Sequence, residues 1–259
     1  MGRAKPLAAM FVVSVGSVMF LSACKEAEAP THEATVSTTP AATATVTQAA
    51  ITVIEPRPGQ QVTVPLTVKG TASVFEGTVV VAVESTDGST TFCKTFTTAS
   101  EGAPGTGSFE TQIAFPPPSN ATDGRVRVYS VSPKDGSIQN LVSVPIVISS
   151  EQPAIVVDSP LCGAEVKSPV TVKGTASAEV FEAAVVVVVK DSLGEELARA
   201  NVVANMQNAT GTPPRGPFSA DLSFSLVGGS QPGTIEAFST SARDGSVINL
   251  FSVPVTLTP

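Results

Sequence analysis

Short runs of alternating apolar and polar residues extend from residue 51 to residue 257, and turn residues separate them. Alternation with a period of two is typical of β-strands that bury one face, and no segment has a sustained helical period. Pro-Gly (58–59), Asp-Gly (87–88, 123–124, 135–136) and the Gly/Pro-rich stretch 102–107 predict turns. The predicted strands are 51–55, 61–70, 78–84, 90–97, 108–115, 125–132 and 138–148, followed by 155–158, 165–174, 183–190, 195–203, 217–224, 234–241 and 247–257.

The strands fall into two copies of one unit. PLTVKGTA at 65–72 returns as PVTVKGTA at 169–176, and VFE occurs at 74–76 and at 180–182. DGSIQNLVSVPIVI at 135–148 returns as DGSVINLFSVPVTL at 244–257. A period of about 100 residues is a domain duplication, because solenoid repeats are much shorter. We therefore predict an all-β protein with two antiparallel sandwiches of about seven strands each, at 51–149 and 154–258.

Alternation also selects the core. Val126 and Val128, with Ile235 and Ala237 in the second copy, are expected to face the core, and Arg127 and Glu236 to face away from it. Tyr129 and Phe238 share the outer face and are expected to cover a neighbouring edge. The run 184–189 is apolar on both faces, which indicates either a central strand beneath a long loop or a face that meets a partner domain.

The N-terminal segment predicts export. Arg3 and Lys5 precede an apolar run that ends in Leu21-Ser22-Ala23-Cys24, a motif that resembles the lipobox of bacterial lipoproteins. The resemblance implies a signal peptide at 1–23, diacylglycerol on the Cys24 sulfur and an extracytoplasmic protein anchored to a bacterial membrane. Lys25 stands where an aspartate would retain it at the inner membrane, which favours the outer membrane in a host that has one. The alternative is an ordinary signal peptide with an incidental cysteine.

Residues 24–50 are rich in Ala, Thr and Pro and predict a flexible tether. His32 lies in this segment and is expected to be solvated rather than a ligand. After it, the order VKGTA, VFE and DGS followed by N-L-x-S-V-P resembles the immunoglobulin-like domain of bacterial spore germination proteins, called Gmad2. The resemblance implies two seven-stranded immunoglobulin-like sandwiches and brings no catalytic residues. The separate partner domain that usual germination proteins carry has no counterpart here.

Charge and composition exclude several classes of function. The formal net charge is −7, and loss of Arg3 and Lys5 with the signal peptide would leave −9. An acidic chain without basic clusters lacks the electrostatic footprint of a nucleic-acid-binding protein. Trp is absent, and Tyr and His each occur once, so aromatic platforms and histidine-based catalysis are disfavoured.

Few residues are candidates for chemistry. Cys93 and Cys162 occupy non-equivalent positions in the two copies, so Cys162 is expected to lie in a loop far from the first unit; a Cys93–Cys162 bridge is the alternative. No histidine in either unit could activate them. The acids that recur are Glu76 with Glu182, expected to begin a solvent-facing strand, and Asp135 with Asp244, expected to cap their own turns. Asn120 and Asn208 match the glycan-acceptor pattern by chance. No catalytic, cofactor or metal site is predicted.

The prediction is a non-enzymatic, membrane-anchored lipoprotein of the cell envelope. Its two immunoglobulin-like domains would serve protein binding or structural organisation, and the resemblance relates them to sporulation and germination proteins. The alternative is an accessory module that binds peptidoglycan or another polysaccharide. Segments 94–107 and 200–215 differ between the copies, so functional differences are expected there.

Overall fold

The computed structural model describes residues 49–259. The predicted signal peptide (1–23), the predicted lipidation site Cys24 and almost all of the predicted tether (24–50) lie outside these residues. Within residues 49–259, no helix is long and apolar enough to cross a membrane.

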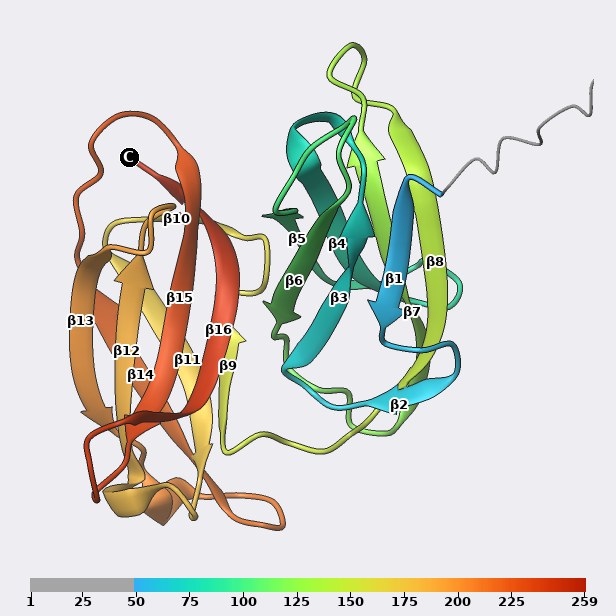
Figure 1. Cartoon of the computed structure of the whole chain (residues 1–259). Helices are drawn as coiled ribbons and strands as arrows, with labels where there is room; N and C mark the ends of the chain where they lie inside the picture. Colours follow the sequence, from blue (N-terminus) through green and yellow to red (C-terminus); the bar gives the residue numbers. More distant parts are fainter. Residues whose placement is uncertain (1–48) are drawn as a thin grey trace, which may run out of the picture. The chain divides into compact units, whose positions relative to one another are not determined.

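The first folded unit is a β-sandwich of two sheets (Figure 1). Its strands are β1 (Ile51–Glu55), β2 (Gln60–Val62), β3 (Leu66–Ala72), β4 (Thr78–Ser85), β5 (Thr91–Thr98), β6 (Gly107–Ile113), β7 (Thr122–Val131) and β8 (Ile138–Ile148). One sheet has the order β1-β3-β6 and the other the order β2-β8-β7-β4-β5. Neighbouring strands are antiparallel except β2 and β8, which are parallel.

The second unit repeats this arrangement. Its strands are β9 (Ile155–Ser159), β10 (Glu165–Lys167), β11 (Val170–Ser177), β12 (Ala184–Lys190), β13 (Glu196–Val203), β14 (Arg215–Leu222), β15 (Gln231–Thr240) and β16 (Val247–Thr258). The sheets are β9-β11-β14 and β10-β16-β15-β12-β13. The prediction of tandem immunoglobulin-like sandwiches is confirmed.

Each core lies between the two sheets of its sandwich. Burial along β3 alternates residue by residue, because successive side chains point to opposite faces of a strand. All four predicted core residues on β7 and β15 are confirmed and have no exposed surface: Val126, Val128, Ile235 and Ala237.

The glycine of the repeated VKGTA motif is required by packing. Gly70 lies on β3, and a Cβ at this position would lie 2.6 Å from Cζ of Phe109 on β6. In the second copy, a Cβ on Gly174 would lie 2.5 Å from Cζ of Phe218. The phenylalanine ring, with the backbone oxygen of Thr52 in the first copy and of Val156 in the second, therefore occupies the space that any side chain on this glycine would need, which explains why both copies keep it.

The prediction of single strands at 61–70 and 165–174 is wrong. Each segment forms two strands, so each sandwich has eight strands rather than seven. The chain changes sheets in between, because β2 pairs with β8 in the larger sheet whereas β3 pairs with β1 and β6 in the smaller one. Pro65 and Pro169 stand at the crossings, where the missing N–H prevents a continuous ladder.

The prediction of a turn at Asp123-Gly124 is also wrong, because both residues lie within β7. Gly124 pairs with Ser85 and Ile146, and a Cβ on it would lie 2.9 Å from the Glu84 carbonyl oxygen. This glycine allows a close approach of strands and does not form a hairpin.

The predicted central position of the apolar run 184–189 is confirmed, since β12 lies between β13 and β15. Val188 faces away from the sandwich core yet has no exposed surface. Its cross-strand neighbours on that face are Arg199 and Glu236. Long side chains from the adjacent strands therefore lie beside this valine on the outer face.

Candidate functional sites

The recurring aspartates cap turns, as predicted. Asp135 Oδ1 accepts hydrogen bonds from the Ser137 backbone N–H (3.1 Å) and hydroxyl (2.7 Å), and Asp244 accepts the same pair from Ser246 (3.1 and 2.7 Å). These hydrogen bonds, foremost that from the serine hydroxyl, lower the pKa of each aspartate below its ordinary value. Residues 49–259 contain no group of three or more side chains that could hold a metal ion.

The repeated VFE segment forms a tight turn that holds a phenylalanine ring in solvent. In the 3₁₀ turn η1 (Phe75–Gly77), the preceding Val74 is buried, whereas Phe75 is 63% exposed. Glu76 has a left-handed backbone (φ +53°), a conformation that costs a non-glycine residue about 1–2 kcal/mol. The prediction that Glu76 begins a strand is wrong, because β4 begins at Thr78.

The second copy repeats this geometry. In η2 (Phe181–Ala183), Phe181 is 62% exposed and Glu182 has φ +53°, while the preceding Val180 is buried. Both copies of the turn thus keep an unfavourable backbone at the same position beside an exposed ring. Backbone strain that recurs in this way is typical of functional positions.

Backbone hydrogen bonds fix η1 against a neighbouring loop. The Ala99 N–H donates to the Gly77 carbonyl (2.8 Å), and the Ala103 N–H donates to the Val74 carbonyl (2.8 Å). The hairpin between β7 and β8 reaches the same end of the sandwich, because β4 begins where β7 ends, with Val80 opposite Tyr129. In the second copy, the Ala204 N–H donates to the Ala183 carbonyl (2.9 Å). We call the 3₁₀ turn and the adjoining β7–β8 or β15–β16 hairpin of each sandwich its loop end.

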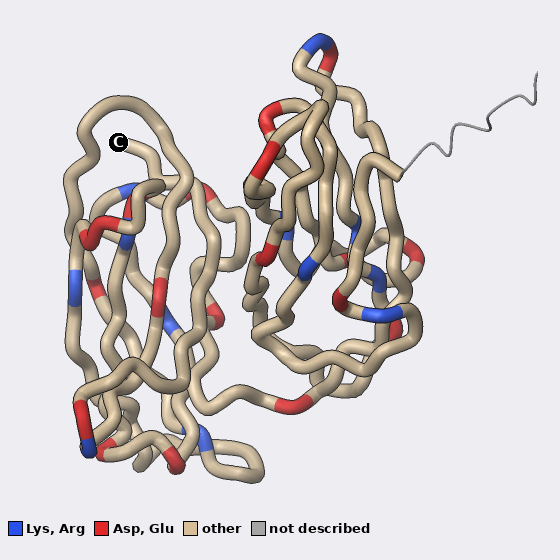
Figure 2. The backbone as a smooth tube through the Cα atoms, viewed as in Figure 1, with Lys and Arg blue, Asp and Glu red and all other residues tan. Residues whose placement is uncertain are grey.

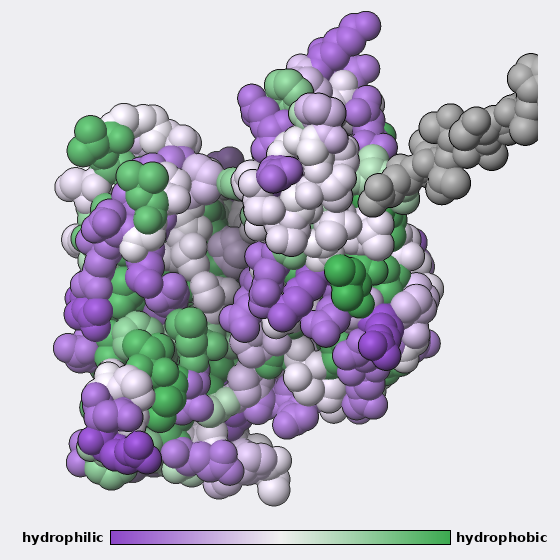
Figure 3. All heavy atoms as spheres, viewed as in Figure 1, coloured by the Kyte–Doolittle hydropathy of each residue, from purple (hydrophilic) through white to green (hydrophobic). Residues whose placement is uncertain are grey.

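Aliphatic side chains are exposed at both loop ends. In the first sandwich, they are Val131, Ile138 and Leu141, which are 45–49% exposed; in the second they are Val247, Ile248 and Leu250, which are 38–54% exposed. Figure 3 shows apolar surface over the larger sheet of the second sandwich, interrupted by hydrophilic residues. Each sandwich therefore combines one exposed ring with exposed aliphatic residues at the same end.

Charged residues cover the outer face of the larger sheets. Glu84 on β4 accepts hydrogen bonds from Arg125 (3.1 Å) and Arg127 (3.1 Å), and the Arg127 guanidinium lies 5.6 Å from the centroid of the Tyr129 ring. The second sandwich has a Lys190–Glu236 ion pair at 2.8 Å and Arg199 over the Phe238 ring at 5.9 Å. Tyr129 and Phe238 are each only 5% exposed. Acidic and basic residues are interspersed over both units, with no basic cluster (Figure 2).

The prediction that the two cysteines lie apart is wrong, because Cys93 and Cys162 form a disulfide with 5.1 Å between their Cα atoms. Cys93 lies on β5, the edge strand of the larger sheet in the first sandwich, and Cys162 lies in the loop between β9 and β10. A cysteine at a sheet edge can reach a partner outside its own sandwich. The Cys162 Sγ also lies 3.7 Å from the Lys94 carbonyl oxygen; as a disulfide sulfur it carries no proton, so this is a contact.

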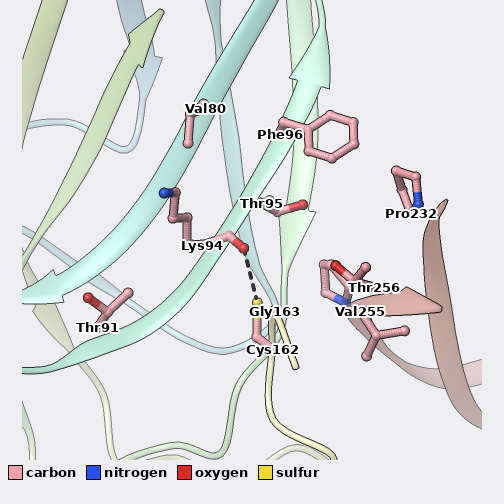
Figure 4. A pocket seen from close by; sticks show the side chains of 11 residues that line it. Val80, Thr91, Lys94, Thr95, Phe96, Cys162, Gly163, Pro232, Val255 and Thr256 are labelled. Carbon is pink, nitrogen blue, oxygen red and sulfur yellow. Dashed lines mark hydrogen bonds between the residues drawn. The ribbon is translucent and has the colours of Figure 1, made fainter. Parts of the chain in front are cut away.

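A cavity of about 430 Å³ adjoins this disulfide. Lys94 and Phe96 of β5, Cys162, Pro232 and Pro254 are among the residues that line it. Figure 4 shows the Phe96 ring pointing toward Pro232. The Lys94 amine points to the side of Val80, away from Pro232 (Figure 4).

Sequence reasoning singled out the acids of the VFE and DGS motifs but neither Phe75 nor Phe96. The sequence signal that could have identified Phe75 is the recurrence of a large apolar residue at the same place in both copies of the VFE motif. Phe96 and Lys94 lie in segment 94–107, which was singled out because it is not repeated, and both line the cavity beside the disulfide.

Comparison with known proteins gives one family. The family model described as "Immunoglobulin-like domain of bacterial spore germination" (Gmad2) matches residues 50–137 and 154–246. No curated protein matches the chain.

Similar solved structures include the BSP domain of a biofilm-associated protein (16% identity, 81% of this chain and 30% of that chain, TM-score 0.25). Others are the fibronectin(III)-like modules of Clostridium thermocellum CbhA (14%, 80% and 93%, TM-score 0.20) and dimeric latent PorU from Porphyromonas gingivalis (10%, 80% and 24%, TM-score 0.28). The chain thus spans less than a third of the first and third structures. TM-scores this low carry no conclusion about function.

Proposed function

Because the chain belongs to the Gmad2 family of immunoglobulin-like domains of bacterial spore germination, we propose that it is a non-enzymatic binding protein of the bacterial cell envelope. Each sandwich would present its loop end to a protein partner. The single observation that carries this proposal is the duplicated exposed phenylalanine, Phe75 and Phe181, held in each copy by a strained turn.

An exposed ring of this kind suits a protein interface. Aromatic residues surrounded by less critical contacts dominate the binding energy of most interfaces. A ring that is 63% exposed can still lose on the order of 100 Å² of apolar surface on binding, which corresponds to about 2.5 kcal/mol. The flanking aliphatic residues at each loop end would exclude water around the ring.

Two copies of the loop end on one chain favour a partner with repeated sites, or two copies of one partner. Linking two weak sites makes the second binding event intramolecular and can raise the apparent affinity by about 100-fold or more. This advantage is a reason for a duplication to keep the same exposed residue in both copies.

The partner is proposed to be a protein rather than a polysaccharide. Carbohydrate sites commonly combine an exposed Trp or Tyr ring with polar groups that bond the sugar hydroxyls; the chain has no tryptophan, and its single tyrosine is 5% exposed beneath Arg127. The exposed rings lie at the same end of each sandwich as exposed aliphatic side chains, a combination that matches an apolar protein surface.

We propose further that Cys24 carries the lipid anchor that places the sandwiches at the membrane surface, in keeping with the lipobox-like sequence Leu21-Ser22-Ala23-Cys24. Cys24→Ala is expected to release the protein from the membrane fraction or to leave it unprocessed. This part of the proposal would be refuted if the Cys24→Ala protein stayed in the membrane fraction with the same mass as the wild type.

Site-specific photo-crosslinking in the host tests the protein partner. Benzoylphenylalanine is placed at position 75 or 181, and, as matched controls, at Val227 or Leu193, which are 98% and 84% exposed. A discrete protein adduct from positions 75 and 181 and none from the controls is the expected result. If all four positions give the same adducts, or none gives any, the loop ends are not a protein-binding surface.

A further inference from the structure

Each loop end keeps a glutamate at a backbone position that disfavours it. Glu76 and Glu182 both have φ +53°, and they directly follow the exposed rings of Phe75 and Phe181. The left-handed region is favoured by glycine, asparagine and aspartate, and glutamate is not among the residues that adopt it readily. The fold alone would therefore select one of those three residues at positions 76 and 182.

The two copies differ immediately beside this glutamate. The next residue is Gly77 in the first turn and Ala183 in the second, although both have a positive φ (+66° and +50°). Before the ring, the first copy has SV at 73–74 where the second has AEV at 178–180. Because these neighbours changed while the glutamate stayed, both copies preserve its side chain and not merely the shape of the turn.

Within residues 49–259, neither Glu76 nor Glu182 forms an ion pair. Both residues are exposed. Acids with a structural role in this chain do have partners: Glu84 pairs with two arginines, and Asp135 accepts hydrogen bonds from Ser137. A carboxylate that is kept against the preference of its backbone, without an ion-pair partner in the described fold, indicates a cation outside the chain.

A second exposed acid adjoins each turn, and the two come from different parts of the sequence. In the first copy it is Glu101, whose carbonyl oxygen would lie 3.1 Å from a Cβ on Gly77. In the second copy it is Glu179, which precedes Phe181 by two residues. Acids beside an exposed ring oppose its contact with an anionic lipid surface and favour a cationic partner.

We propose that each loop end binds a basic protein surface, with the ring of Phe75 or Phe181 in an apolar pocket and the following glutamate paired with a lysine or arginine at the rim of that pocket. A rim charge of this kind contributes specificity and fast association more than affinity. The inference rests on the proposed function, since it names the chemistry of the partner at the same site.

Aspartate and asparagine give a matched pair of variants, because they have the same size and both tolerate a positive φ but differ in charge. The mature chain without its lipid, as the Cys24→Ala protein, is cosedimented with envelopes of its own host. Glu76→Asp with Glu182→Asp should bind within about threefold of the wild type, whereas Glu76→Asn with Glu182→Asn should bind about tenfold more weakly. Both variants should unfold at a urea concentration at least as high as the wild type does, since both relieve the backbone.

Chemical modification of the envelopes tests the cation on the partner. Lysine amines are acetylated with sulfosuccinimidyl acetate, and guanidinium groups are blocked with phenylglyoxal, before the chain is added. Binding of the wild type should fall to the level of the asparagine variant, whose own binding should change little. As the control, Glu151→Gln with Glu195→Gln removes two exposed acids outside the loop ends and should bind as the wild type does.

The inference is overturned if the aspartate and asparagine variants bind equally, or if the control variant is weakened as much as the asparagine variant. If the former happens while Phe75→Ser with Phe181→Ser loses binding, the charge is excluded and the protein-binding function stands. Both proposals fail if the wild type does not bind or if the serine variant binds as the wild type does. Binding to phosphatidylglycerol vesicles that requires Phe75 and Phe181 would assign the loop ends to a lipid surface and would also overturn the inference.

Discussion

Reduction of the Cys93–Cys162 disulfide should destabilise both sandwiches. The bond closes a loop with a sequence separation of 69, which contains β6, β7 and β8 of the first sandwich and β9 of the second. In the chain-entropy description, a loop of this length restricts the unfolded ensemble by about 4 kcal/mol at 25 °C. Because the loop contains strands of both sandwiches, the loss on reduction is expected to be divided between their two unfolding transitions.

The chain provides a built-in way to observe the two sandwiches separately. It has one tyrosine and no tryptophan, so intrinsic fluorescence reports only on Tyr129 in the first sandwich, whereas far-ultraviolet circular dichroism reports on both. Urea unfolding is followed by both signals in the oxidised protein and again after treatment with a phosphine reductant. The reduced protein should unfold at lower urea, with the losses at the two transitions adding up to at most about 4 kcal/mol.

The control is Cys162→Ser, which lacks the bond and should not respond to the reductant. Cys162 is chosen because it is only partly buried, whereas Cys93 is 1% exposed and a serine there would bury a hydroxyl group. The reasoning is refuted if two thiols become titratable on reduction but neither transition moves. It is equally refuted if both thiols are already free in the untreated protein.

Three further predictions concern single side chains. Gly70→Ala should lower the free energy of unfolding by about 1–3 kcal/mol because the new Cβ would collide with the Phe109 ring, whereas Gly229→Ala, with open space around it, should be nearly neutral in the same urea titration. NMR titration should give Asp87 a pKa of about 2, because the Ser85 hydroxyl and the Ser89 N–H and hydroxyl donate hydrogen bonds to its carboxylate. Ser85→Ala should raise this pKa toward the ordinary value. Because the folded pKa is the lower one, the contribution of Asp87 is present above about pH 4 and is lost as the pH falls toward 2, and an unshifted pKa would refute the turn geometry. Glu84→Gln should cost roughly 2 kcal/mol, because it leaves two partly buried guanidinium groups without a counter-charge, and an unchanged urea midpoint would show that the ion pairs contribute nothing.

Much of the fold could be predicted because the duplication repeats each strand signal. The alternation of apolar and polar residues placed Val126 and Val128 in the core. The same alternation located nearly every strand. The change of sheet near Pro65 could not be predicted in the same way, because residues on both sides of it alternate in the same register as one long strand.

The candidate sites were harder to predict than the strands, because they depend on three-dimensional geometry that the linear pattern of residues does not contain. Phe75 was missed because apolar residues are expected in the core, and the turn that leaves its ring exposed beside the left-handed Glu76 is not visible in a linear pattern. The disulfide was only the alternative from sequence because Cys93 and Cys162 are non-equivalent in the repeat, and nothing in either copy alone predicts a bond between the copies.

Cosedimentation with envelope membranes tests the central claim most directly. The mature chain without its lipid, as the Cys24→Ala protein, is mixed with envelopes from its own host before and after protease treatment of the envelopes. Saturable binding that protease abolishes is expected, with Phe75→Ser and Phe181→Ser each weakening it and the double variant losing it, while Val227→Ser binds as the wild type. A double variant that sediments like the wild type, or binding that survives protease treatment, would contradict the account.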